Sequence, residues 1–297
     1  MDIYRSLWTA ANRLKPGVWI ESGYEAPVFA RGFAHSWRLA ADYPAFSNPY
    51  PFAGLLEQVT YAVAQWELLG RRAHVGFVYG GPETLDVQRQ WLAAAVALQA
   101  QATLSVDLAN TSSETARLYR EYLAAHYPFQ GSFVTGPGLA PDQFSTTLDG
   151  TTYLGLLNRG SETTNVTIDP VVHGLIPGRS GVAFDPSTRE SFTLAGTTSV
   201  PVPPASFRLL VLRQDPGVVW ADRSWSQTGG GSPALTIELA PSPLAEGHLW
   251  VYARRALMVS LDDQLTDVQV LDPLTGVLSI EFFDGDPHRV QITSLAP

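Results

Sequence analysis

The stretch AHVGFVYGGPETLDVQRQWLAAAVALQAQATLSVDL (73–108) decides the fold class of this chain. Residues 73–81 form an apolar, strand-like run, and residues 102–108 form another. Between them, residues 88–99 have helical character and many small alanines, which allow a helix to lie close against a sheet. A strand, a helix and a strand in this order predict a βαβ unit with parallel strands.

The same alternation continues on both sides of this unit. Apolar residues within 3–14 recur at helical spacing, and Lys15-Pro16-Gly17 ends that helix before a short strand at 17–22. A helix follows over 54–70 and stops at Gly70. Farther on, Thr111 with Glu114 predicts a capping box for a helix over 113–126. We therefore expect residues 1–128 to form an α/β domain.

The chain changes character after Pro128. Short β-prone runs bounded by Gly, Pro, Asn and Asp follow one another, which predicts an antiparallel β-sandwich over 129–215. Residues 226–233, SQTGGGSP, have the composition of a linker or a long loop. Alternating strands then resume, so we expect a second, small β domain over 216–297.

Composition excludes several function classes. Acidic residues outnumber basic ones by 28 to 19, a formal net charge of −9, so no basic stripe exists for nucleic acid. The chain has no cysteine, which excludes disulfides, a thiolate nucleophile and Cys-ligated zinc. No signal peptide or membrane-spanning run is present, so we expect a soluble chain of unknown compartment.

Polar side chains recur where the predicted parallel strands end. Glu21 ends one strand, Arg38 and Asp42 follow the next, Tyr79 ends the strand of 73–81, and Asp107 ends the strand of 102–108. A parallel α/β barrel performs its chemistry at the carboxyl ends of its strands, so these residues should converge on one rim. The six histidines lack metal-ligand spacing, and we expect neither a metal nor a cofactor.

Two of these segments resemble a known family. Trp37-Arg38-Leu39-Ala40-Ala41-Asp42-Tyr43 resembles the W-R-x-x-x-D segment of the α-galactosidase (melibiase) group of glycoside hydrolases, and GVWIESG (17–23) is similar to the preceding barrel strand of that group. The resemblance covers roughly 17–213. It implies the second half of a (β/α)8 barrel followed by a β-sandwich domain.

The resemblance also implies residue roles in a retaining α-glycosidase. Asp42 would be the general acid/base, while Glu21 and Arg38 would hold sugar hydroxyls. The residues themselves fit this chemistry, because glycoside cleavage needs a carboxyl group that protonates the leaving oxygen and a second carboxylate opposite it. Aromatic side chains offer flat apolar faces to a sugar ring, and Trp37 and Tyr43 stand beside the acid. Tyr79 is a further aromatic residue that we expect to contact the substrate.

One part of the family pattern is missing from the chain. The family's nucleophilic Asp lies in a Y-x-K-x-D segment, and only a helix precedes 17–23 here. We therefore expect half a barrel that does not turn over substrate alone. Its open sheet edges need cover from a partner chain or from self-association.

Plainer interpretations stay open for the same residues. Arg38 and Asp42 could form a structural ion pair, Glu21 could be an ordinary loop residue, and Asp107 could cap the helix that follows it. At the level of function, the alternative is a non-catalytic carbohydrate-binding or assembly module in the β domains. Trp250 and Tyr252 alternate along a strand, so we expect one face of that strand to lie in a core.

Overall fold

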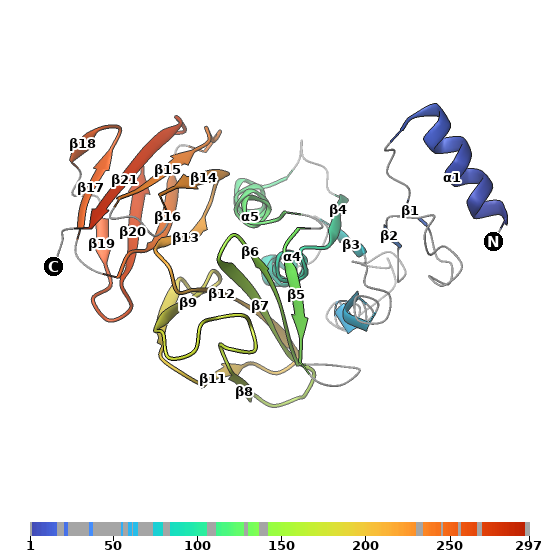
Figure 1. The fold of residues 1–297 in the computed structure, drawn as a ribbon, viewed down its shortest axis with the longest axis horizontal. Helices are drawn as coiled ribbons and strands as arrows, with labels where there is room; N and C mark the ends of the chain where they lie inside the picture. Colours follow the sequence, from blue (N-terminus) through green and yellow to red (C-terminus); the bar gives the residue numbers. More distant parts are fainter. Residues whose placement is uncertain are drawn as a thin grey trace.

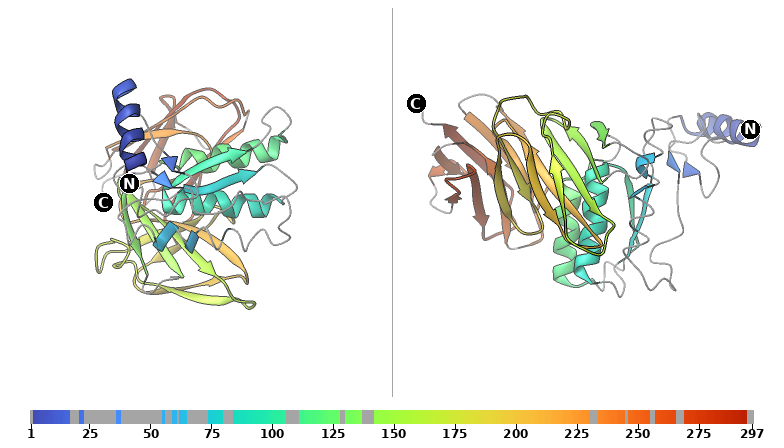
Figure 2. Two further views of the ribbon diagram at one scale, coloured as in Figure 1. Left: turned by 90° about the vertical axis from the view of Figure 1, so that its right-hand side faces the viewer. Right: turned by 90° about the horizontal axis from the view of Figure 1, so that it is seen from below.

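A computed structural model gives the fold of this chain. It describes residues 2–16, 21–22, 36–37, 55, 59–60, 62–64, 74–79, 84–105, 111–127, 130–136, 142–229, 234–244, 246–254, 257–265 and 269–294. The described part is elongated, with α1 (Asp2–Leu14) at one end and the C-terminal sheets at the other (Figure 1). Figure 2 shows the intervening helices and sheet from two further sides.

The α/β part contains two pairs of parallel strands. In the first, β1 (Glu21–Ser22) lies beside β2 (Ser36–Trp37). In the second, β3 (His74–Tyr79) pairs with β4 (Gln101–Ser105). The helix α4 (Leu85–Leu98) connects β3 to β4, which confirms the predicted βαβ unit. Closure of these strands into a barrel stays a prediction.

Local chemistry sets the ends of α4. The Thr84 hydroxyl accepts a hydrogen bond from the Val87 N–H at 3.4 Å and caps the first turn. Gln99 ends the helix in the left-handed conformation, with φ 44°. Every residue from Trp91 to Leu98 is buried, because α4 lies between the β3–β4 pair and the sheet that follows. None of the described helices is long and apolar enough to cross a membrane.

The next helix is capped one residue later than predicted, at Ser112 instead of Thr111. The helix α5 (Ser113–Ala124) has Ser112 as its N-cap, and the Ser112 hydroxyl accepts from the Thr115 N–H at 3.1 Å. Both Thr111 and Ser112 carry a hydroxyl that can cap, so side-chain chemistry alone could not choose between them. Glu114 lies in the first turn, where its negative charge interacts favourably with the positive end of the helix dipole.

The middle of the chain folds into an antiparallel six-stranded sheet of order β10-β9-β12-β7-β6-β5 and a two-stranded β8–β11 ribbon. The strands are β5 (Ser132–Thr135), β6 (Gln143–Leu148), β7 (Thr151–Asn158), β8 (Thr164–Ile168), β9 (Gly181–Asp185), β10 (Glu190–Leu194), β11 (Thr198–Val202) and β12 (Ser206–Arg213). All eight residues of β7 are buried, because one face of the sheet packs on the ribbon and the other on α4.

The C-terminal part contains two antiparallel sheets, of order β13-β16-β20-β19 and β14-β15-β21-β17-β18, with a core between them. Their strands are β13 (Gly217–Ala221), β14 (Trp225–Thr228), β15 (Ala234–Leu239), β16 (Gly247–Tyr252), β17 (Leu257–Leu261), β18 (Gln264–Leu265), β19 (Gln269–Leu271), β20 (Val277–Phe282) and β21 (His288–Ser294). β14 pairs with β15 and includes residues 226–228, so the expectation of a linker or long loop over 226–233 was wrong for these three residues, whose backbone is held in a sheet; residues 230–233 lie outside the described part of the chain.

Both faces of β16 are buried, so the expectation of a single core face was incomplete. Leu249 and Val251 point into the C-terminal core. Trp250 and Tyr252, on the opposite face, belong to the core that contains α4, α5 and the six-stranded sheet. One apolar core therefore extends through all three parts of the chain.

We expect Gly155→Ala to destabilise the protein by about 1–3 kcal/mol, because it overpacks the sheet–helix core. A Cβ at Gly155 would lie 2.7 Å from Phe207 Cζ and 2.8 Å from Phe144 Cζ. Gly196→Ala is the control, since a Cβ there meets nothing within 4 Å. Urea unfolding measures both variants, and equal midpoints would contradict this packing.

Stability should also fall as the pH drops below about 6.5, because two histidines are held neutral in the folded state. Burial lowers the pKa of His126 and of His173. His173 Nδ1 lies 2.9 Å from the Ser145 hydroxyl and Nε2 lies 3.1 Å from Gln143 Oε1, contacts that suit the neutral ring. The unfolded chain then binds more protons than the folded chain between pH 6.5 and the lowered pKa.

Replacing His173 with Gln should reduce the loss of stability between pH 7.5 and pH 5.5. Chemical unfolding at the two pH values gives the comparison. An identical loss in the wild type and in His173→Gln would show that this ring does not contribute.

Candidate functional site

Two of the predicted sugar-binding residues lie on neighbouring strands. Glu21 is opposite Ser36 in the register of the β1–β2 pair, and Trp37 is opposite Ser22. Because the strands are parallel, their carboxyl ends meet at one edge. The register thus places Glu21 and Trp37 one position apart on neighbouring strands, and their roles as sugar ligands stay a prediction.

The remaining predicted residues divide into two groups. Tyr79 is the last residue of β3 and pairs with Ser105, the last residue of the parallel strand β4. It therefore lies at a carboxyl edge, as expected. Arg38, Asp42 and Tyr43 lie outside the described residues, and so does Asp107. The catalytic assignment to Asp42 stays a prediction.

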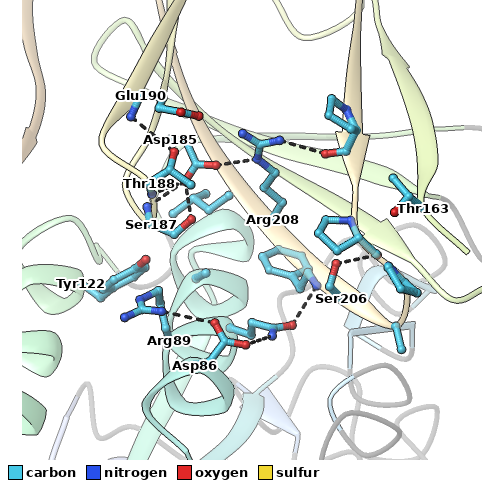
Figure 3. Close-up of a pocket in the computed structure, with 18 residues that line it drawn as sticks. Asp86, Arg89, Tyr122, Thr163, Asp185, Ser187, Thr188, Glu190, Ser206 and Arg208 are labelled. Atoms are coloured by element: carbon cyan, nitrogen blue, oxygen red, sulfur yellow. Dashed lines mark hydrogen bonds and ion pairs between the residues drawn. The ribbon is translucent and has the colours of Figure 1, made fainter. Parts of the chain in front are cut away.

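The described residues contain a cleft of about 510 Å³ between α4 and one end of the six-stranded sheet (Figure 3). The first turns of α4 form one side of the cleft. The β9–β10 turn and the β11–β12 connection form the other side. No local sequence pattern indicated this cleft, because its two sides are more than 90 residues apart in the chain.

An ion pair fixes the sheet side of the cleft. Asp185 is buried, and Arg208 Nε lies 2.5 Å from its Oδ2. The other Asp185 oxygen accepts from the Ser187 N–H at 2.7 Å and the Ser187 hydroxyl at 2.6 Å. Arg208 also donates to the Pro201 carbonyl at 2.8 Å. Asp185 is thus fully engaged in holding the β9–β10 turn.

The helix side of the cleft carries a second ion pair. Asp86 accepts from Arg89 Nη1 at 3.2 Å and from Gln90 Nε2 at 2.9 Å. Gln90 Oε1 in turn accepts from the Phe207 N–H at 2.9 Å, which ties α4 to the start of β12. Asp86 remains 67% exposed and faces the cleft, so its carboxylate can still accept hydrogen bonds.

Tyr122 of α5 also lines the cleft, but its phenol is not an acid/base group. Burial, and after it the nearby charge of Glu121, raises the pKa of Tyr122 far above its usual range. Its ring meets the Trp220 ring edge to face, with centroids 5.2 Å apart. Tyr122 is therefore a neutral wall of the cleft.

A buried carboxylate behind the cleft joins three parts of the chain. Glu121 of α5 accepts from Trp220 Nε1 of β13 at 2.6 Å, and Arg189 Nη1 from the β9–β10 turn lies 2.5 Å from the same oxygen. The Arg189 guanidinium also lies over the Trp250 ring of β16, 4.6 Å from its centroid. We call Glu121, Arg189, Trp220 and Trp250 the junction.

The described residues contain no cluster of three His, Asp or Glu side chains that could hold a metal ion. Asp86 and Asp185 in the cleft and Glu121 in the junction are each paired with an arginine.

No family model and no curated protein matches the sequence. Solved structures do match the fold. α-Galactosidase I from Mortierella vinacea matches with a TM-score of 0.53 and 20% identity, over 71% of this chain and 62% of that one. A GH27 β-L-arabinopyranosidase from Geobacillus stearothermophilus matches with a TM-score of 0.56 and 14% identity, over 71% and 53%.

A third match includes the C-terminal sheets. The isomalto-dextranase of Arthrobacter globiformis T6 aligns with 100% of this chain and 63% of its own, with a TM-score of 0.50 and 12% identity. At these identities the matches show the fold: an α/β part followed by β-sheets, as in α-galactosidases and related enzymes. The chain spans 53–63% of the length of these three structures.

Removing the junction carboxylate should destabilise the protein strongly. We expect Glu121→Ala to cost about 2–3 kcal/mol, because Arg189 and the Trp220 N–H lose a buried acceptor. Glu114→Ala is the matched control on the same helix; this residue is exposed, and its loss should change stability by no more than about 0.5 kcal/mol. Urea unfolding curves compare the two, and similar midpoints would show that the junction contributes little.

Proposed function

We propose that this chain carries the sugar-binding side of an α-galactosidase-like retaining glycosidase. The observation that carries the proposal is the parallel β1–β2 pairing, which brings Glu21 and Trp37 to one strand edge in a chain with the fold of solved glycosidases. The W-R-x-x-x-D segment continues directly from β2. An uncharged sugar also suits a chain with a formal net charge of −9.

Each residue of the segment has a proposed role. Asp42 is the general acid/base that protonates the leaving glycosidic oxygen and later activates water. Arg38 and Glu21 bind sugar hydroxyls, as guanidinium and carboxylate groups can each make two directed hydrogen bonds. Trp37 and Tyr43 offer apolar faces to the C–H side of the ring.

The reaction needs a second carboxylate on the opposite side of the glycosidic bond. A Y-x-K-x-D segment does not occur in the 297 residues, whose only lysine is Lys15. We therefore propose that this chain binds a galactoside but does not hydrolyse it alone. The second carboxylate would come from a partner chain that covers the strand edges.

The β domains are the alternative carriers of sugar binding. Trp250 and Tyr252 are the aromatic residues that suggested this role, but both are buried in the core shared with α4, α5 and the six-stranded sheet. Their ring faces pack against protein rather than solvent. We therefore favour the strand edge of the α/β part.

Calorimetric titration with methyl α-galactoside tests the proposed site. Asp42→Asn and Arg38→Met should weaken binding about tenfold or more, since each removes a charged hydrogen-bonding partner. Asp263→Asn makes the same chemical change in an exposed turn and should bind as the wild type does. Unchanged affinity in both site variants would refute the assignment.

Hydrolysis of an aryl α-galactoside tests the missing nucleophile separately. We expect no turnover by the purified chain. Turnover that disappears in Asp42→Asn would show that the chain contains its own second carboxylate.

A further inference from the structure

We propose that the cleft between α4 and the six-stranded sheet is a second binding site, for a neutral carbohydrate. This site is distinct from the strand edge that carries Glu21 and Trp37, and it does not depend on the proposed function. The volume of about 510 Å³ lies within the usual range for small-molecule sites. The chemistry of its two walls defines the class of ligand.

One wall of the cleft is apolar and rigid. Pro203 and Pro204, both exposed, line it from the connection between β11 and β12. Phe207 at the start of β12 borders the cleft but is only 5% exposed, because its ring packs in the core. Proline fixes the backbone, and hydrogen bonds hold this connection further: Ser206 donates to the Pro203 carbonyl at 2.7 Å. Such a surface suits the C–H face of a sugar ring, which is apolar and loses little water on contact.

The first turns of α4 and the β9–β10 turn form a wall rich in hydrogen-bonding groups. Asp86 and Arg89 lie on α4, Thr188 lies in the β9–β10 turn, on the same side of the cleft as the prolines, and Glu190 begins β10 (Figure 3). The ion pairs already described hold both arginines of the cleft in place, so the wall is organised before a ligand arrives. Carboxylates that remain exposed, as on Asp86 and Glu190, accept hydrogen bonds from sugar hydroxyls.

The charge of the lining argues against an anionic ligand. Asp86, Asp185 and Glu190 contribute three negative charges, and Arg89 and Arg208 contribute two positive ones, which gives a net charge of −1. Phosphate and sulfate groups pair most strongly with arginine side chains, and in the described lining the two arginines are outnumbered by three carboxylates. An uncharged polyhydroxyl ligand meets both an apolar wall and a wall of alternating donors and acceptors.

Saturation-transfer NMR and calorimetric titration with raffinose and maltotriose test the site on the full chain. We expect weak binding by the wild type. Asp86→Ala and Glu190→Ala should each weaken it about tenfold, because each removes a charged acceptor. Thr188→Trp should block binding sterically, since Thr188 is an exposed turn residue at the cleft and the larger ring can enter it.

Glu114→Ala is the matched control for Asp86→Ala. Both residues are acidic, exposed and in the first turn of a helix, but Glu114 does not line this cleft. Asp263→Asn, an exposed position that does not line the cleft, should leave this binding unchanged. Maltotriose is the probe that separates the two sites, because raffinose carries an α-galactosyl group that the proposed strand-edge site would also bind. Circular dichroism and urea unfolding confirm that each variant is folded.

Three outcomes would overturn the inference. The first is the absence of binding of either sugar by the folded wild type. The second is unchanged binding in all three cleft variants. The third is preferential binding of inorganic phosphate or of a proline-rich peptide over the sugars at the same residues.

Discussion

The structure between residues 84 and 294 depends on one buried carboxylate. Glu121 is 4% exposed, and a charge at that depth is unfavourable unless its oxygens are paired. Its partners come from the turn of the six-stranded sheet and from the first C-terminal strand, 99 residues farther along the chain. The helix, the middle sheet and the C-terminal sheets must therefore assemble around the same atom. Because Trp220, Trp250 and Tyr122 surround it with apolar surface, the packing and the pairing stabilise the same arrangement.

This assembly gives the functional surfaces a rigid support. α4 is held by the β3–β4 strands on one side and by the sheet on the other, and its first turn forms the cleft. The same βαβ unit places Tyr79 at the end of β3. The end of β3 and the cleft are thus built on one βαβ unit, so a change in the core that moves α4 would alter both. The C-terminal sheets contribute indirectly, through Trp220 and Trp250 at the junction.

Local patterns predicted most of the elements and little of their assembly. The βαβ unit followed from residues 73–108, and turn residues separated the strands from β7 to β12 correctly. The strands β5, β6, β13 and β14 were not predicted. β5 follows Gly131, β13 follows directly after Asp215-Pro216, where we placed a boundary, and β14 runs into the glycine-rich stretch that we interpreted as a linker. The cleft and the junction could not be predicted, because their partners are far apart in sequence and Arg189 resembles any other turn residue. Glu21 and Trp37 were proposed because strand ends and a family motif coincide there, and their role in a site stays a prediction.

Differential scanning calorimetry of the whole chain tests the central claim most directly. If the shared core and the Glu121 junction couple the helices to both sets of sheets, residues 84–294 unfold together. The calorimetric and van't Hoff enthalpies of the main transition should then agree. Two resolved transitions, with the C-terminal sheets melting separately from α4, α5 and the six-stranded sheet, would contradict this account.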